Sequence, residues 1–329
     1  MNKKLLLSLP LLMAASLFTS CESGDPEFDD FEGGTSVYFA YQYPVRTIVL
    51  GDDEYDTSLD KAHKCQIKAT FGGSYNGSNG SVQIAVDNSL VNNLTFADGT
   101  PVKAMPENYY TLSTTNLAFG GTFYGTTEVQ LSDAFFNDPD AVKNTYVIPI
   151  YMTNQTGFGK ILSGTLKEGA TAVRTDPSVW EVAPMDYVLY CVKFQNKYTG
   201  WWLTNGNTSI ENIEKGKQVQ TTCRSLNSVV YNVEFQSGSD LYNADLLLTF
   251  DGNDNCTITS LTSGVTATGT GSFGDNTELK AWGNKDRDGM ELNYTVDFGN
   301  GHKWSTHEKL VWWRSGVKLE EFAPVYSSK

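Results

Sequence analysis

Short stretches of alternating apolar and polar residues run along the chain from residue 35 to about residue 160, separated by turns rich in Gly, Asn and Asp. In Lys64–Phe71, for example, Cys65, Ile67, Ala69 and Phe71 share one face and polar residues fill most of the other. This period of two predicts half-buried β-strands. The other strands predicted in this region are Ser36–Gln42, Arg46–Leu50, Val82–Val86, Tyr109–Leu112, Thr127–Leu131 and Tyr146–Met152.

Strands at this spacing, with no sustained helical periodicity, favour an antiparallel β-sandwich of immunoglobulin-like shape over residues 35–160. Single helical turns are expected within residues 88–95 and 131–142. Residues 161–185 lack periodicity and contain Pro177 and Pro184, so we predict that they link two domains. Trp180 is expected to pack into the seam between those domains.

A second series of strands occupies residues 186–329, giving an all-β fold class for the whole chain. Asp251–Asn255 and Asn300-Gly301 are strong hairpin signals. Consecutive hairpins favour an antiparallel, lipocalin-like up-and-down β-barrel, with a second sandwich as the alternative. The strands predicted here are Tyr187–Phe194, Tyr198–Leu203, Leu246–Phe250, Thr257–Leu261, Val265–Phe273, Glu278–Trp282, Met290–Phe298, His302–Ser305 and Leu310–Arg314.

The first 20 residues follow a different pattern, in which Lys3 and Lys4 precede an apolar run. This pattern predicts a secretory signal peptide over residues 1–20, and the run is too short for a permanent membrane span. The exit Leu17-Phe18-Thr19-Ser20-Cys21 resembles the lipobox of bacterial lipoproteins. The resemblance implies that Cys21 is lipidated and becomes the first residue of the mature protein.

The acidic stretch that follows, residues 21–34, resembles the tethers of Bacteroidota-type surface lipoproteins. The resemblance implies an outer-membrane location, with a lipid anchor and exposure at the cell surface. The net charge is −14, with 38 acidic and 24 basic residues. Such acidity argues against binding to nucleic acid or to anionic membrane surfaces, and it suits a neutral or cationic ligand.

Four cysteines follow Cys21, and no two form a CxxC pair, so a zinc ribbon or a thioredoxin-type motif is not expected. Three of them fall in the second half, where at most one disulfide can form. Buried reduced thiols that act as small hydrophobic groups are an equally good interpretation. The four residues are Cys65, Cys191, Cys223 and Cys256.

The sequence offers little for catalysis, and we expect no catalytic residues, no metal and no cofactor. His302 and His307 lie five residues apart, on opposite faces of a regular strand, which favours surface positions over a metal pair. Asp251–Asn255 begins like a calcium loop, but Cys256 replaces the required glycine and Thr262 the bidentate acid. A glycosidase with two distant carboxylates stays open as an alternative.

Two tryptophan pairs lie on predicted strands, Trp201-Trp202 and Trp312-Trp313. Because side chains alternate, one tryptophan of each pair should point away from the core. Flat aromatic faces can stack on sugar rings, whereas packing against the sandwich or under a loop is the alternative use of such residues. An aromatic-lined pocket in the barrel lumen is a third possibility. The predicted carbohydrate-binding residues are Trp201, Trp202, Tyr198, Asn196, Trp312 and Trp313.

The first half resembles an uncharacterised β-sandwich domain of Bacteroidota surface lipoproteins, through Val37–Ala40, Arg46–Gly51, Gly72-Gly73 and Asn144–Pro149. In some relatives that domain precedes the catalytic barrel of family 18 endo-β-N-acetylglucosaminidases. This chain lacks their clustered acids, which resemble DxxDxDxE, and two β-domains leave no room for a barrel of about 250 residues.

The second half resembles the C-terminal domain that accompanies this sandwich in lipoproteins of glycan-utilisation loci, through Tyr187–Leu189, Val192–Gly200 and Leu310-Val311. Together the resemblances imply a non-catalytic surface glycan-binding lipoprotein of a starch-utilisation-type uptake system. Its implied partners are a glycan, an outer-membrane TonB-dependent transporter and a companion lipoprotein. The alternative is a structural or adhesive surface protein whose tryptophans contact another protein.

Overall fold

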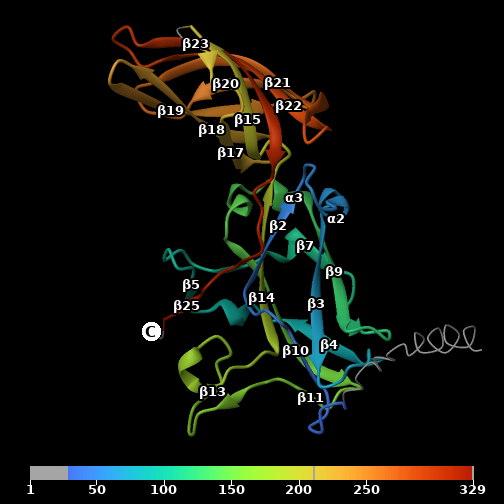
Figure 1. Cartoon of the computed structure of the whole chain (residues 1–329). Coiled ribbons are helices and arrows are strands. Elements are labelled where there is room, and N and C mark those ends of the chain that lie inside the picture. The colour runs from blue at the N-terminus through green and yellow to red at the C-terminus, as the bar shows by residue number, and fades with distance from the viewer. Residues whose placement is uncertain (1–28, 210–211, 328–329) are drawn as a thin grey trace, which may run out of the picture.

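The computed structural model describes residues 29–209 and 212–327 as two β-structures stacked end to end, a sandwich and a closed barrel (Figure 1). This confirms the predicted all-β fold class. The predicted signal peptide and Cys21 lie outside the described residues. No helix in the described part of the chain has both the length and the apolar character to cross a membrane.

Two sheets form the sandwich. The first has the order β11-β1-β3-β9-β7, with β11 (Lys160–Ile161), β1 (Ser36–Tyr38), β3 (Lys64–Gly72), β9 (Tyr124–Leu131) and β7 (Tyr110–Leu112). The second has the order β24-β2-β14-β10-β4-β8, and β6 also pairs with β10. Its strands are β24 (Glu320–Glu321), β2 (Pro44–Val49), β14 (Tyr187–Gln195), β10 (Tyr146–Thr156), β4 (Ser81–Val86), β8 (Asn116–Ala118) and β6 (Lys103–Ala104).

The helical segments of the sandwich are short and lie in its connections. The turns expected within residues 88–95 and 131–142 are present as η2 (Asn88–Val91), α3 (Asp133–Phe136) and η4 (Pro139–Val142). Asp87 and Asp138 cap η2 and η4 by accepting backbone N–H bonds, as acidic residues do at helix starts. The other segments are α2 (Ser58–Lys61), η3 (Glu107–Tyr109) and η5 (Pro177–Val179).

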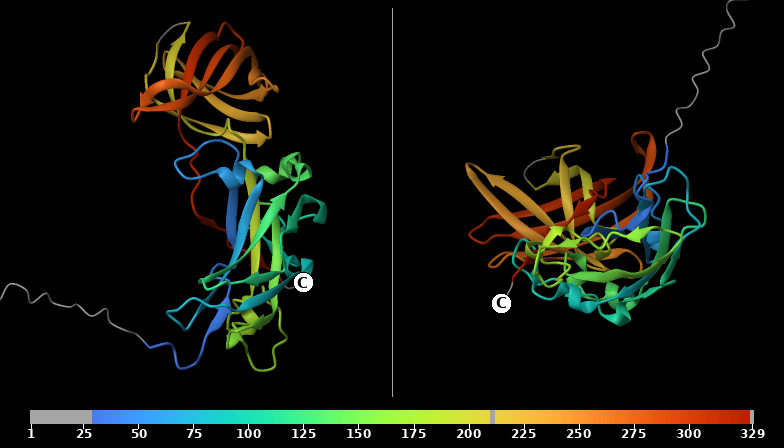
Figure 2. Two further views of the ribbon diagram at one scale, coloured as in Figure 1. Left: turned by 90° about the vertical axis from the view of Figure 1, so that its right-hand side faces the viewer. Right: turned by 90° about the horizontal axis from the view of Figure 1, so that it is seen from below.

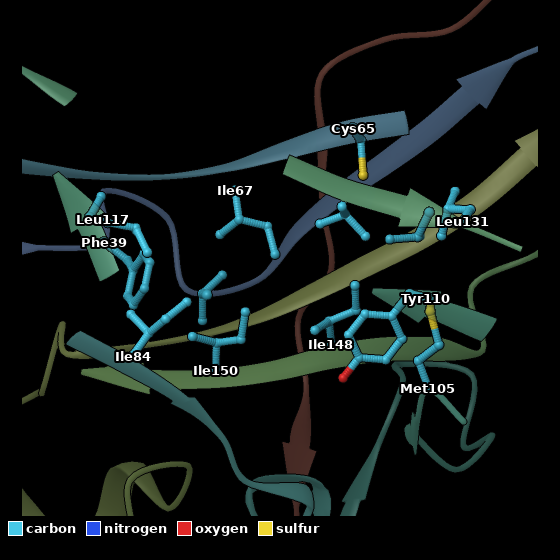
Figure 3. Close-up of a cluster of buried hydrophobic side chains, with 14 of the residues drawn as sticks. Phe39, Cys65, Ile67, Ile84, Met105, Tyr110, Leu117, Leu131, Ile148 and Ile150 are labelled. Carbon is cyan, nitrogen blue, oxygen red and sulfur yellow. The ribbon is translucent and has the colours of Figure 1, made fainter. Parts of the chain in front are cut away.

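Alternating apolar residues from both sheets meet in the sandwich core (Figure 3). On β3, Cys65 and Ile67 are buried, and on the opposite sheet Ile84, Ile148 and Ile150 are buried as well. Full burial of each large aliphatic side chain contributes roughly 1.5–3 kcal/mol to folding. The period-two pattern that predicted these strands therefore also identifies the residues that hold the two sheets together.

Strand β14 belongs to the sandwich, so the boundary predicted at residue 186 lies instead after Gln195, where β14 ends. It lies between β10, to which it is antiparallel, and β2, to which it is parallel. Val188, Val192 and Phe194 enter the sandwich core, whereas Leu189 and Cys191 join a second apolar cluster on the other face. Burial on both faces explains the nearly continuous apolar run, which alternation alone does not assign to either domain.

The segment predicted as an interdomain linker, residues 161–185, instead forms an excursion from the end of the sandwich that is remote from the barrel (Figure 1). It contains β12 (Thr165–Leu166) paired with β13 (Trp180–Val182). The indole Nε1 of Trp180 donates to the carbonyl of Val173 at 2.8 Å. The expectation that Trp180 packs into the domain seam is therefore wrong, because the chain continues through β14 before it leaves the sandwich.

The second domain is a closed barrel of eight antiparallel strands in sequence order, with closure between the first and the last. This confirms the barrel over the second sandwich. Leu203 pairs with Val311 across the closing seam. The strands are β15 (Gly200–Thr208), β17 (Gln218–Ser225), β18 (Ser228–Ser237), β19 (Asp240–Phe250), β20 (Asn255–Ser260), β21 (Thr266–Trp282), β22 (Lys285–Asp297) and β23 (Lys303–Arg314), with the short β16 (Asn212–Ile213) beside β15.

The chain returns to the sandwich after β23, so the predicted barrel domain is also too long at its C-terminal end. Strand β24 pairs with β2, and β25 (Val325–Tyr326) pairs with β5 (Leu94–Thr95). Phe322 is buried in the apolar cluster on the outer face of β14. Two chain segments therefore connect the domains, one after Gln195 and one after Arg314.

All four described cysteines carry free thiols. Cys65, Cys191 and Cys256 are buried, and burial raises the pKa of Cys65 to about 12. This resolves the open alternative in favour of small buried hydrophobic groups. Asp251 begins a hairpin turn between β19 and β20, in which its carboxylate accepts N–H bonds from Asn253 and Asn255.

Candidate functional site at the domain junction

The two tryptophan pairs face each other across the seam that closes the barrel. Trp202 pairs with Trp312, and the next paired residues are Trp201 and Arg314, so Trp313 is the extra residue of a β-bulge. A bulge re-aims the side chains beside it and increases the local twist. The pairing of β15 with β23 therefore brings the four tryptophans together, and side-chain alternation along each strand turns one tryptophan of each pair inward.

One tryptophan of each pair belongs to the barrel core. Trp202 is 0% exposed and Trp312 is 5% exposed. The Trp202 indole Nε1 donates to the hydroxyl of Thr221 at 2.9 Å. The rings of Trp202 and Trp312 are thus covered by protein rather than open to a ligand at the surface.

The other two tryptophans are half-buried and gather around one arginine. The Arg314 guanidinium lies 4.3 Å from the ring centroid of Trp313 and 5.6 Å from that of Trp201. Such cation–π contacts contribute about 0.5–1 kcal/mol at exposed sites. The two outward tryptophans therefore form one patch, at the end of the barrel next to the sandwich.

Residues 315–327, which follow β23 and lead back to the sandwich, form the return segment. Its Gly316 lets this segment pack against Trp201. The Gly316 φ of +80° lies in the left-handed region, and a Cβ at this position would stand 2.9 Å from Trp201 Cδ1. Glycine adopts this conformation without steric penalty and leaves room for the ring. The indole of Trp201 is thereby fixed between the barrel and the segment that returns to the sandwich.

Tyr198 and Asn196 organise the turn that enters the barrel. The Tyr198 ring stacks on Phe250 at 3.7 Å, and its hydroxyl donates to Asp254 at 2.6 Å. The Asn196 amide donates to the carbonyls of Ser225 and Ser228 at 2.7 and 3.0 Å. Both residues are buried, so in this structure they support the site rather than line it.

A cleft of about 830 Å³ lies between the domains, beside Trp201. The junction of the two domains is visible in the side views of Figure 1 and of Figure 2, left. Sandwich, barrel and return segment all contribute to its walls. Its lining includes Asp53, Lys193, Gln195, Trp201, Gln220, Arg314 and Glu320.

Two residues that line this cleft each have a buried polar atom with no hydrogen-bond partner among the described residues. These atoms are Asp53 Oδ2, an acceptor, and Gln195 Nε2, a donor. The other carboxylate oxygen of Asp53 accepts the backbone N–H of Glu54 at 2.7 Å. Most buried polar groups in proteins are paired, so an unpaired acceptor and donor in one cleft call for a ligand or ordered water.

The charged groups of the cleft come from different segments. Lys193 Nζ on β14 lies 2.8 Å from Glu320 Oε2 on the return segment. Burial acts to raise the pKa of Glu320, but hydrogen bonds from Lys193 and Asn144 outweigh it and the pKa is lowered. The Glu320 carboxylate therefore stays ionised and holds the return segment on the sandwich at neutral pH.

Sequence reasoning identified Trp201 but missed Asp53, Gln195, Arg314 and Gly316. In the sequence, Asp53 follows the predicted strand Arg46–Leu50, and Gln195 directly follows the predicted strand Tyr187–Phe194. No local pattern connects these positions, because they come from three segments far apart in the sequence. The one available signal was the closeness of Arg314 to Trp312-Trp313.

Fold and cleft together define a two-domain all-β protein with a polar, tryptophan-lined cleft at the domain junction. A structural-genomics protein of unknown function from Bacteroides ovatus is 32% identical over 91% of this chain and 100% of its own, with a TM-score of 0.81. The chain therefore belongs to the same family as that protein. Residues 196–316 match the domain of unknown function DUF5627, and residues 31–159 match a family model described as an N-terminal domain.

Two more distant solved structures also come from Bacteroides ovatus. A multidomain protein including DUF1735 is 10% identical, covers 87% of this chain and 99% of its own, and has a TM-score of 0.39. A putative carbohydrate binding protein is 16% identical, covers 88% of this chain and 70% of its own, and has a TM-score of 0.25. Similarity this low carries no argument about the present chain. No curated protein matches it.

Proposed function

We propose that this protein is a non-catalytic, surface-displayed glycan-binding lipoprotein and that the junction cleft holds its ligand. The observation that carries the proposal is the cleft itself, in which the indole of Trp201 accompanies the unpaired atoms Asp53 Oδ2 and Gln195 Nε2. Of the six predicted binding residues, only Trp201 lines this cleft, and in this proposal it supplies the aromatic ring that contacts the ligand.

The chemistry of the cleft matches that of a sugar. Ligand sites combine apolar or aromatic walls with a few placed polar groups, and a volume of about 830 Å³ falls in their usual range of about 300–1,000 Å³. A hydroxyl both donates and accepts hydrogen bonds, so sugar hydroxyls match an acceptor such as Asp53 Oδ2 as well as a donor such as Gln195 Nε2. The apolar face of the same ring would lie on the Trp201 indole.

The arrangement of the domains is compatible with capture outside the cell. The described chain begins at residue 29, at the end of the sandwich opposite the barrel (Figure 2). If Cys21 is lipidated, the sandwich stands nearest the outer membrane and the cleft lies farther out. The TonB-dependent transporter and the companion lipoprotein belong to this proposal through the sequence resemblance.

The test is retention of the purified protein on a panel of immobilised glycans. We expect Trp201→Ala and Asp53→Asn each to lower retention at least tenfold, because one removes the stacking surface and the other the unpaired acceptor. Asp52→Asn is the matched control, since Asp52 lies in the same turn and pairs with Lys61 on the surface. That variant should bind like the wild type.

Retention on no glycan, or retention unchanged in the Trp201 variant, would refute the proposal. Capture of a surface protein that competing sugars do not displace would favour the adhesive alternative. Release of a soluble product from a retained glycan would show that the protein is an enzyme.

A further inference from the structure

The wall of the closed barrel has a gap between β17 and β18, which pair over only part of their length. Pairing between β17 and β18 ends at Thr221 and Tyr231. Beyond that point β18 continues to Ser237, paired with β19 along its whole length but with no described strand on its other side. A slot therefore separates this half of β18 from the segment that contains Lys217.

A cavity of about 400 Å³ lies behind the slot, within the usual range of ligand sites. Its polar lining includes Glu308 and Thr306 of β23, Tyr294 of β22 and Tyr231 of β18, and the charged residues Lys217, Glu234 and Asp245 also line it. It is distinct from the junction cleft, since the two cavities share only Gln220 and Thr222 at their margins.

Glu308 is a buried carboxyl group with neutral partners. It is 2% exposed and accepts hydrogen bonds from the hydroxyls of Tyr294 at 2.7 Å and Tyr231 at 3.2 Å. Among the described residues it forms no ion pair, and Lys217 acts on it only through its charge. A buried carboxylate without a paired cation is destabilising, and a cation bound beside it would experience a stronger Coulomb attraction than at the surface.

A second atom of the cavity has unused hydrogen-bonding capacity. The Thr306 side chain is buried and interacts with the Tyr294 hydroxyl, acting to lower the pKa of that phenol, but its Oγ1 makes no hydrogen bond of normal length and angle with any described residue. Apolar walls stand beside it, formed by Val219, Val233 and Phe235. The cavity thus combines two hydrogen-bond acceptor groups, Glu308 and the Thr306 hydroxyl, with apolar walls.

We propose that the barrel lumen binds a small molecule with a primary ammonium group on an apolar body, the ammonium group donating to Glu308 and Thr306 Oγ1. An ammonium group carries three donors and no acceptor. Both phenols donate to Glu308 already, and each of its oxygens keeps a free lone pair for a further donor. Charge-assisted hydrogen bonds of this kind are about twice as strong as neutral ones.

The first experiment compares two probes by titration calorimetry, tyramine and its neutral alcohol analogue tyrosol. They have nearly the same shape and differ in an ammonium group against a hydroxyl. We expect tyramine to bind at least tenfold more tightly. Equal affinities, or the absence of tyramine binding at millimolar concentration, would overturn the proposal.

The second experiment places the probe in the lumen. Glu308→Gln should lower tyramine affinity at least tenfold, and Thr306→Val severalfold, while glycan retention at the junction cleft stays unchanged. Glu291→Gln is the matched control, because Glu291 is an exposed acid of the neighbouring β22. An unchanged affinity in Thr306→Val and Glu308→Gln would overturn the assignment. Should Glu308→Gln fail to fold, Thr306→Val and the probe pair still decide.

Discussion

Glu308 shows at the scale of a single residue how burial ties stability to pH. Burial raises the pKa of its carboxyl above the ordinary value, and hydrogen bonds from Tyr294 and Tyr231 oppose that rise only in part. The folded protein therefore holds the Glu308 proton more tightly than the unfolded chain does. The charged groups around the carboxyl are Lys217 at the slot and Glu234 and Asp245 at its rim.

The first prediction follows from the raised pKa of the Glu308 carboxyl in the folded protein. The stabilising effect of the protonated Glu308 carboxyl is fully present below its unfolded pKa and is lost as pH rises through the higher folded pKa. Urea unfolding of wild type and Glu308→Gln from pH 4.5 upward measures it. The wild type should lose stability relative to the variant as pH rises, and parallel curves would contradict the prediction.

At the scale of an element, the alternation of side chains along β15 separates a structural tryptophan from the candidate binding tryptophan. Trp201 and Trp202 are adjacent in sequence, yet Trp202 is fully buried in the barrel and Trp201 lines the junction cleft. Substitution experiments on this pair must therefore measure the free energy of unfolding and ligand binding separately.

We therefore predict opposite outcomes for the two alanine variants. Trp202→Ala should lower the free energy of unfolding by about 3–5 kcal/mol, because it leaves a cavity in the barrel core and removes the hydrogen bond from the indole to the Thr221 hydroxyl. Trp201→Ala should lower it by less than about 1.5 kcal/mol while weakening glycan retention. Chemical denaturation of the purified variants measures both, and similar losses in the two would show that Trp201 is also a core residue.

At the scale of the whole molecule, the chain joins its domains twice and ends on the sandwich. Phe322 of the return segment packs in the apolar cluster with Val45 and Leu189. Leu319, three residues earlier, is 85% exposed. The return segment thus stabilises the sandwich although it follows the barrel in sequence.

Phe322→Ala should therefore destabilise the sandwich, although the barrel is the domain that directly precedes Phe322 in the sequence. We expect a loss of about 3–5 kcal/mol in the sandwich, the usual effect of truncating a buried phenylalanine. Hydrogen exchange should become faster in β2 and β14 and stay unchanged in β18 and β19. Leu319→Ala is the control and should leave both domains as they are; faster exchange in the barrel would contradict the assignment.

The sequence by itself predicted most of the strands and several turns and favoured a barrel for the second domain, but it gave no prediction for the barrel strands β17 and β18. Alternation in Lys64–Phe71 reports one buried face, and Asn300-Gly301 specifies a tight turn, so both are local properties of the chain. The alternation of strand side chains also predicted one inward and one outward tryptophan in each pair, as observed at Trp202 and Trp201.

Only the tertiary structure decided which strands pair over long distances and which polar atoms meet. The parallel pairing of β14 with β2 and the return of Phe322 to the sandwich have no local signal, since an apolar residue does not specify its partner. The same holds for Asp53, Gln195 and Trp201 in one cleft and for Glu308 behind its slot. These sites arise where distant segments leave hydrogen-bonding groups unpaired, and that is a property of the folded arrangement alone.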